Sequence, residues 1–224
     1  MSLTTGRGPL GPNPAGRFST PLPAGVVYVE PFARRVRALL AGHEVVDSER
    51  AVLVHHQASP PTYAFPAEDV DGAPTEDEPD APGHVRVPWD AVDAWFEENE
   101  EVHGHPRNPY HRIDILRTDR RLRVAVGGTV LVDTTETLVL HETALAPRLY
   151  VPPRVVRMDL LVANPTTTYC PYKGTASYWT AVVDGTTVDD VAWTYEDPLP
   201  ESTPIRGMLS FYADRADVLA ALPT

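Results

Sequence analysis

One pattern occurs twice in the sequence, and its second copy is Arg120-Arg-Leu-Arg-Val-Ala-Val-Gly-Gly-Thr-Val-Leu-Val-Asp133. Its earlier copy is Arg34-Arg-Val-Arg-Ala-Leu-Leu-Ala-Gly-His-Glu-Val-Val-Asp47, which lies 86 residues before it. Each copy has two apolar runs around a glycine turn, which is typical of a β-hairpin. The same offset aligns residues 27–70 with 113–156 without a gap. The chain is therefore predicted to contain two related β domains.

The two copies differ in length. Val87 to Asp93 resembles Phe211 to Asp217 at an offset of 124, so the first copy lacks 38 residues (124 − 86). The missing part corresponds to most of Arg157 to Gly207, and the acidic segment Asp71 to Pro82 bridges the gap. Because this segment has no aromatic or large aliphatic residue, we interpret it as a solvated loop rather than a metal site. These boundaries predict an N-terminal arm (1–26), a degenerate first repeat (27–98), a linker (99–112) and a complete second repeat (113–222).

Further strands are predicted in the second repeat. Leu138-Val-Leu140 and Leu149-Tyr-Val151 are short apolar runs, and Ser177 to Val183 alternates before a turn at Asp184-Gly185. In the first repeat a short helix is predicted near Trp89 to Glu98, since Val92, Trp95 and Phe96 form an apolar stripe. The predicted fold class is mainly β.

Composition excludes several classes of protein. The net charge of −12 opposes binding to nucleic acid, and there is no apolar run long enough for a membrane span. Cys170 is the only cysteine, which excludes an internal disulfide framework and fits a reducing cytoplasm. Three histidines of the linker have no carboxylate at ligand spacing, and no metal site or cofactor is expected; they are His103, His105 and His111.

Only the second repeat contains Thr168-Tyr-Cys-Pro-Tyr-Lys-Gly-Thr-Ala-Ser-Tyr-Trp179. This stretch resembles the hallmark of the domain of unknown function 427 (DUF427) family. His141-Glu-Thr143 and Pro147-Arg-Leu-Tyr150 match the family as well, and His105 to Asp114 resembles the linker of its tandem actinobacterial members. The resemblance implies a compact β fold of the tent type, in which two sheets are pinned at one edge.

The resemblance also bears on function. Some tent-fold relatives bind zinc through cysteine pairs, which this chain lacks, and others hold a small ligand in an aromatic cage. A nucleotidyltransferase label has been attached to the family. No glycine-serine loop precedes paired aspartates in this chain, so its sequence does not support that label.

Cys170-Pro-Tyr-Lys173-Gly174 is predicted to form a turn, which brings Cys170 and Lys173 close together. A nearby ammonium favours the reactive thiolate. Two interpretations remain open. In the functional one, Cys170 is a nucleophile or Lys173 binds a ligand. In the structural one, Cys170 is buried in a packed turn and Lys173 is exposed. Glu142 is an acid, a base, or the partner of Lys173 or Arg148. His141 recurs as His55, which indicates a packing role that both repeats share.

Aromatic residues are dense in the second repeat. Tyr178 and Trp179 lie on opposite faces of one predicted strand, whereas Trp193 and Tyr195 share a face. A cage for a flat or cationic ligand and ordinary core packing both explain them. The candidate ligand-binding residues are Arg148, Tyr150, Tyr172, Tyr178, Trp193 and Tyr195.

Three functions follow from these observations. The first is a cytoplasmic protein that binds an unknown small molecule in the second repeat. The second is an enzyme that uses Cys170, Lys173 and Glu142. The third is an interaction scaffold that acts through the first repeat, and a homodimer is compatible with the sequence. Neither nucleic acid nor a membrane is expected as a partner.

Overall fold

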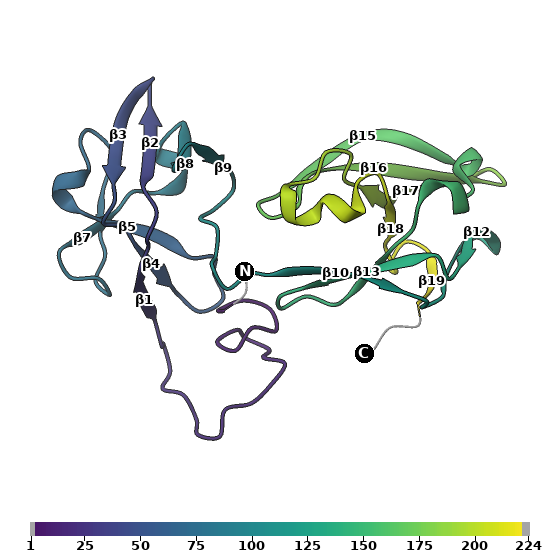
Figure 1. Ribbon diagram of the computed structural model, residues 1–224, viewed down its shortest axis with the longest axis horizontal. Helices are drawn as coiled ribbons and strands as arrows, with labels where there is room; N and C mark the ends of the chain where they lie inside the picture. Colours follow the sequence, from purple (N-terminus) through teal and green to yellow (C-terminus); the bar gives the residue numbers. More distant parts are fainter. Residues whose placement is uncertain (1–2, 221–224) are drawn as a thin grey trace. The chain divides into compact units, whose positions relative to one another are not determined.

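The computed structural model describes residues 3–220 and confirms that the protein is mainly β. The chain divides into two compact units, Met1–His111 (unit 1) and Arg112–Thr224 (unit 2), coloured purple to blue-green and green to yellow in Figure 1. Across residues 3–220 there is no helix whose length and apolar character would let it cross a membrane.

Unit 1 contains two antiparallel sheets, with strand orders β1-β4-β5-β7-β6 and β3-β2-β8-β9. Its elements are β1 (Tyr28–Pro31), β2 (Val36–Leu40), β3 (His43–Ser48), β4 (Val52–His55), β5 (Thr62–Pro66), η1 (Ala67–Asp69), β6 (Glu76–Asp77), β7 (His84–Arg86), η2 (Trp89–Ala91), β8 (Ala94–Glu97) and β9 (Glu100–Val102).

Unit 2 contains three antiparallel sheets, with strand orders β10-β13-β14, β12-β11-β19 and β15-β16-β17-β18. The edges of β14 and β18 meet at Val151 and Leu209, whose backbone N–H groups each donate to the other's carbonyl at 2.9 Å. The elements are β10 (Ile113–Thr118), β11 (Leu122–Val126), β12 (Thr129–Thr134), β13 (Thr137–Glu142), β14 (Arg148–Tyr150), η3 (Pro153–Val155), η4 (Met158–Leu160), β15 (Leu161–Cys170), β16 (Gly174–Val183), β17 (Thr186–Thr194), η5 (Pro200–Ile205), β18 (Leu209–Phe211) and β19 (Asp217–Ala220).

The internal repeat is visible in the strand registers. Tyr28 pairs with His55 in unit 1, and Asp114 pairs with His141 in unit 2, so both partners shift by 86 residues. The two glycine hairpins carry a register shift at the same place, between Ala38 and Leu39 in β2 and between Val124 and Ala125 in β11. The residues that align in the sequence therefore occupy the same backbone positions.

The C-terminal parts of the two repeats differ from the expected alignment by one residue. Ala94 pairs with Leu39, and Asp217 pairs with Ala125, which is the equivalent of Leu39. Ala94 therefore corresponds to Asp217, an offset of 123, whereas the expected alignment gave 124. The strands β15 to β17 have no counterpart among the strands described for unit 1.

The short helix predicted near Trp89 to Glu98 is wrong beyond its first turn. Only η2 is helical, and residues 94–97 form strand β8, which pairs with β2. Trp95 is buried and Phe96 only half-buried, so exposure alternates along β8. Pairing with β2 overrides a local apolar pattern that fits either a helix or a strand.

The segment 71–82 is also less solvated than expected. It contains β6, and the side chain of Glu78 and the methyl group of Ala81 are buried. Ala81 packs in a small apolar cluster with Val54 of β4 and Ala64 of β5. Ala81 thus covers part of one face of this sheet, while most of the segment remains exposed.

Strand β16 separates two clusters of buried residues in unit 2. Tyr178 belongs to an aromatic cluster with Tyr150, Trp193 and Tyr195, whereas Trp179 packs against the aliphatic cluster around Val183. The opposite orientation of Tyr178 and Trp179 confirms the strand prediction. The tight turn at Asp184 and Gly185, both with positive φ, closes the hairpin to β17 as the sequence predicts.

Candidate functional site

A pocket of about 260 Å³ lies against the aromatic cluster of unit 2. It is lined by residues from β13 to β17 and from the loops that follow β13 and β18. Seven of the nine site residues expected from the sequence line it: Glu142, Arg148, Tyr150, Lys173, Tyr178, Trp193 and Tyr195. The structure therefore brings together residues that are up to 53 positions apart in the sequence (195 − 142).

Lys173 and Glu142 form an ion pair in this pocket. The Lys173 ammonium donates to Glu142 Oε2 at 2.5 Å, and the two side chains are only 9% and 8% exposed. Lys173 is directed there by the predicted turn, in which its N–H donates to the carbonyl of Cys170 at 3.2 Å. Gly174 closes the turn with φ of +92°, and a Cβ at this position would lie 3.4 Å from the Asp197 carbonyl oxygen. Glycine therefore suits this position for its backbone conformation and for the close approach of the segment that follows β17.

The aromatic wall of the pocket is held by hydrogen bonds between side chains. The Trp193 indole N–H donates to the Tyr150 hydroxyl at 3.0 Å, and the two rings meet edge to face. The hydroxyls of Tyr178 and Thr168 lie 2.9 Å apart. Both pairs are buried or partly buried, so they fix the orientation of the wall.

Arg148 supplies the second cation of the pocket. Its guanidinium lies 5.8 Å from the centre of the Trp193 ring, which is cation–π geometry. Within residues 3–220 it forms no hydrogen bond or ion pair. Because Glu142 neutralises Lys173, the pocket carries about one net positive charge.

Three phenol groups of the pocket, Tyr150, Tyr195 and Tyr212, are held in the protonated form. Burial raises the pKa of Tyr150 and of Tyr195 well above the usual value for tyrosine. Burial, followed by the interaction with Tyr178, raises the pKa of Tyr212 to about 12. These groups are therefore neutral hydrogen-bond donors or acceptors rather than phenolates.

Two expected site residues do not line the pocket. Cys170 is half-buried and packs against the aromatic cluster, and Tyr172 is buried within that cluster. The turn that was expected to bring Cys170 close to Lys173 is present, but the lysine side chain engages Glu142.

Five residues that line the pocket were not among the expected site residues: the apolar Leu140, Leu145 and Ala146, and the polar Thr168 and Tyr212. Tyr212 follows β18, and its ring stacks parallel to Tyr178 and lies 4.4 Å from the centre of the Trp193 ring. Thr168 was the first residue of the hallmark stretch, so its signal was present in the sequence. Tyr212 lies outside the hallmark stretch and had no such signal.

The shared packing role expected for His55 and His141 is wrong. His55 is fully buried, and its Nε2 lies 2.9 Å from Glu30, whereas His141 is exposed. Burial lowers the pKa of His55, although Glu30 acts in the opposite direction. The cross-strand neighbours differ because Glu30 of β1 is replaced by Leu116 in β10.

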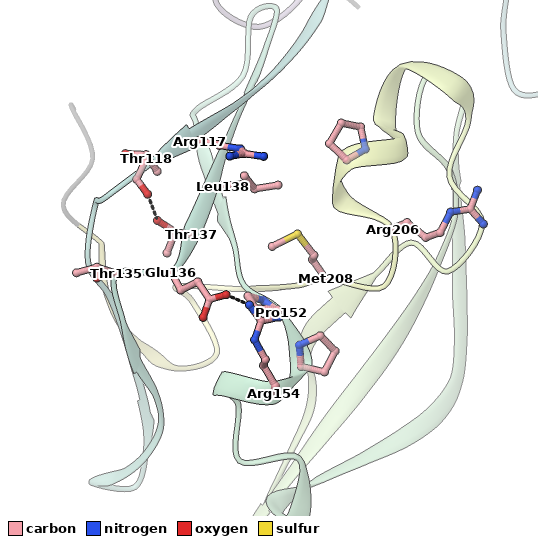
Figure 2. A pocket seen from close by; sticks show the side chains of 12 residues that line it. Arg117, Thr118, Thr135, Glu136, Thr137, Leu138, Pro152, Arg154, Arg206 and Met208 are labelled. Atoms are coloured by element: carbon pink, nitrogen blue, oxygen red, sulfur yellow. Dashed lines mark hydrogen bonds and ion pairs between the residues drawn. The ribbon is translucent and has the colours of Figure 1, made fainter.

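A larger hollow of about 720 Å³ also lies on unit 2. Figure 2 shows Arg117 and Leu138 on one side of it and Met208 facing them. Two of its three arginines are already paired, Arg154 with Glu136 and Arg206 with Asp197. It contains no aromatic side chain and none of the expected site residues, so its size alone does not make it the better candidate.

Comparison with known proteins agrees with the repeated architecture. No curated protein matches the chain. One family model matches two segments, residues 28–96 and 114–221, which together cover more than three quarters of the sequence. The two matches correspond to the tandem arrangement seen in the strand registers. The chain belongs to the family described as a domain of unknown function (DUF427).

Proposed function

We propose that unit 2 binds a small anionic molecule with a flat ring in the pocket beside Lys173. The proposal rests on the position of Arg148. This residue is half-buried, its guanidinium lies over the Trp193 ring, and it pairs with no acidic group within residues 3–220. A guanidinium with free donors beside an aromatic wall is suited to a carboxylate attached to a planar group.

The polar groups of the pocket support the sign of the ligand charge. Glu142 is engaged by Lys173, so it does not offer an unpaired carboxylate to a cationic ligand. The neutral tyrosine hydroxyls add donors around the Arg148 side chain. A monoanion would therefore balance the charge of the pocket.

The volume of the pocket limits the size of the ligand. About 260 Å³ corresponds to roughly nine water molecules in the liquid, at about 30 Å³ each. This suits one ring with an acidic substituent and is small for a nucleotide. The nucleotidyltransferase label therefore receives no support from this pocket.

The alternative functions have less support. An ion-paired ammonium has no free lone pair for Schiff-base formation, and Cys170 does not line the pocket. No observation in unit 1 favours a protein scaffold over other functions. Binding in a reducing cytoplasm remains part of the proposal, since the chain has a single cysteine.

The test uses benzoate and benzamide as probes, because they have the same ring and differ in charge. We expect the wild-type chain to bind benzoate at least about tenfold more tightly than benzamide, since a hydrogen bond to a charged group contributes about 1.5–3 kcal/mol. Calorimetric titration measures both affinities.

Two variants locate the binding site. Arg148→Gln is expected to remove the preference for benzoate, whereas Arg117→Gln, in the larger hollow, is the matched control and should keep it. Benzoate binding that is unchanged in Arg148→Gln, or lost in Arg117→Gln, contradicts the proposal.

A further inference from the structure

Unit 1 has a cluster of three side chains that are common metal ligands. His56 follows the last residue of β4, and Glu78 and Asp80 belong to the segment 71–82. One ligand atom from each residue lies within 4.8 Å of the other two. The three residues therefore face a common point, and the segment that replaces the missing strands supplies two of them.

Two atoms of this cluster are buried without a hydrogen-bond partner. They are Oε2 of Glu78 and Nε2 of His56, neither of which has a partner among the described residues. Glu78 is only 2% exposed, and its other oxygen accepts from the backbone N–H of Asp80 at 3.2 Å. A buried carboxylate oxygen without a partner is costly, so these two atoms point to a group that binds both.

The distances between the ligand atoms suit a bound ion better than direct contact. Nε2 of His56 lies 3.9 Å from Glu78 Oε2, and Nδ1 of the same ring lies 4.0 Å from Asp80 Oδ2. Both distances are too long for a hydrogen bond. A zinc ion lies about 2.0–2.2 Å from nitrogen or oxygen ligands, so two ligands at a tetrahedral angle lie about 3.4 Å apart, and each pair would have to approach by about 0.5 Å to bind one ion. A single ion would use one of the two ring nitrogens.

The charge of the segment favours a cation. Residues 71–82 contain five acidic side chains and no lysine or arginine. Asp80 and His56 are partly exposed, with side-chain exposures of 42% and 32%, so an ion can reach the cluster from solvent. The two carboxylates of the ligand set would balance the charge of a divalent ion.

We propose that His56, Glu78 and Asp80 bind a divalent transition-metal ion such as Zn²⁺. One imidazole nitrogen and two carboxylate oxygens are a ligand set that suits a borderline ion and leaves positions for water. The ion ties the segment 71–82 to the end of β4. It thereby holds the short segment whose Ala81 covers part of the sheet face of unit 1.

The test is a calorimetric titration of the untagged full chain, treated with EDTA and then dialysed, with ZnCl₂. We expect one saturable equivalent of zinc per chain, and Co²⁺ at the same site should give a visible d–d absorption band. Glu78→Gln should lower the zinc affinity at least about tenfold. Asp77→Asn is the matched control, since Asp77 is an exposed carboxylate of the same segment, and it should leave the affinity unchanged.

Either of two results overturns the proposal: no saturable equivalent in the wild-type chain, or equal affinity in the wild type and in Glu78→Gln. If Glu78→Gln does not fold, Asp80→Asn takes its place, because Asp80 is exposed and its loss leaves the buried packing intact. Equal affinity in the wild type and in Asp80→Asn would then overturn the proposal. If His56 and Glu78 only form an ion pair with each other, the wild-type chain should show no saturable equivalent of zinc.

Discussion

The ends of β4 in unit 1 and β13 in unit 2 have the same backbone register and opposite chemistry. The equivalent of His56, 86 residues later, is Glu142. In unit 2 the acid, Glu142, is on the strand and its partner Lys173 comes from the hallmark stretch. In unit 1 the base, His56, directly follows the strand, and the acid Glu78 comes from the segment that replaces that stretch. The residue at the strand end and the residue that faces it from the following segment therefore differ as a pair between the two units.

The neighbouring positions show why only unit 2 has the aromatic pocket. Arg148 and Tyr150 of β14 correspond to Thr62 and Ala64 of β5. Ala64 packs against Ala81, so the small side chains of unit 1 are covered by a short segment. The larger side chains of unit 2 instead face β16 and β17, which have no counterpart among the strands described for unit 1.

The largest expected effect comes from breaking the buried pair of unit 2. Lys173→Met leaves Glu142 buried without its ion-pair partner and should lower the free energy of unfolding by about 3–5 kcal/mol. The double variant Lys173→Met/Glu142→Leu should regain most of this loss, because it buries no charge. Urea unfolding measures the free energies, and Arg206→Met, which breaks an exposed pair, is the control. A double variant as unstable as the single one would show that the pair itself supplies the stability.

A smaller effect is expected from a buried hydrogen bond that only unit 1 has. The Tyr63 hydroxyl donates to Glu97 at 2.6 Å, and the equivalent residue in unit 2 is Leu149. Tyr63→Phe should lower the free energy of unfolding by about 1.5–3 kcal/mol, the usual range for a hydrogen bond to a charged group. Tyr110→Phe, at an exposed tyrosine, should have a smaller effect. Equal losses in the two variants would mean that burial does not set the strength of these bonds.

The two equivalent histidines predict a pH effect that is specific to unit 1. The pKa of buried His55 is lowered in the folded state, so the unfolded chain takes up a proton at a higher pH than the folded one. The stability of unit 1 should therefore fall as the pH decreases below about 6.5, the usual histidine value.

Urea unfolding at pH 7.5 and pH 5.5 measures this effect. His55→Gln should reduce the dependence on pH, and His141→Gln, at the exposed equivalent, is the control. The same pH dependence in wild type and His55→Gln would assign it to other groups.

The smallest effect is expected where the two units are alike. Arg35 pairs with Asp47, and Arg121 pairs with Asp133, each through two hydrogen bonds of 2.6–2.7 Å on the surface. Both arginines hold the pKa of the partner aspartate below its usual value. Because the pairs are exposed and screened by salt, Arg35→Ala and Arg121→Ala should shift the midpoint of thermal unfolding only marginally and by similar amounts. A large shift in one variant alone would mean that the two hairpins are not equivalent.

The sequence predicts the repeated strands well because local and long-range signals agree. Local residue patterns account for the glycine hairpins, the Asp184-Gly185 turn and the alternation in β16. The glycine hairpin also occurs in both repeats, which supports its prediction a second time. The short helix near Trp89 to Glu98 failed because its pattern fits two structures and pairing with β2 decides between them.

The sequence predicts those pocket residues that lie in the hallmark stretch or on the strands that face this stretch. Tyr212 was missed because it reaches the pocket from beyond β18, which only tertiary structure shows. The burial of Glu78 was missed for a similar reason. An acidic segment without large apolar residues has no local feature that indicates burial against a strand end, and the contact with His56 depends on chain positions 22 residues apart (78 − 56).

The position of the ligand pocket can be measured by titrating the full-length chain with benzoate and following its backbone amide resonances by NMR. We expect chemical-shift changes that saturate at one benzoate per chain and are confined to strands β13 to β17, the turns that join them and the loop around Tyr212, with none on β4 or β5. Saturable changes on β4 and β5, or no saturable change anywhere, would contradict the claim that the ligand pocket belongs to unit 2 alone.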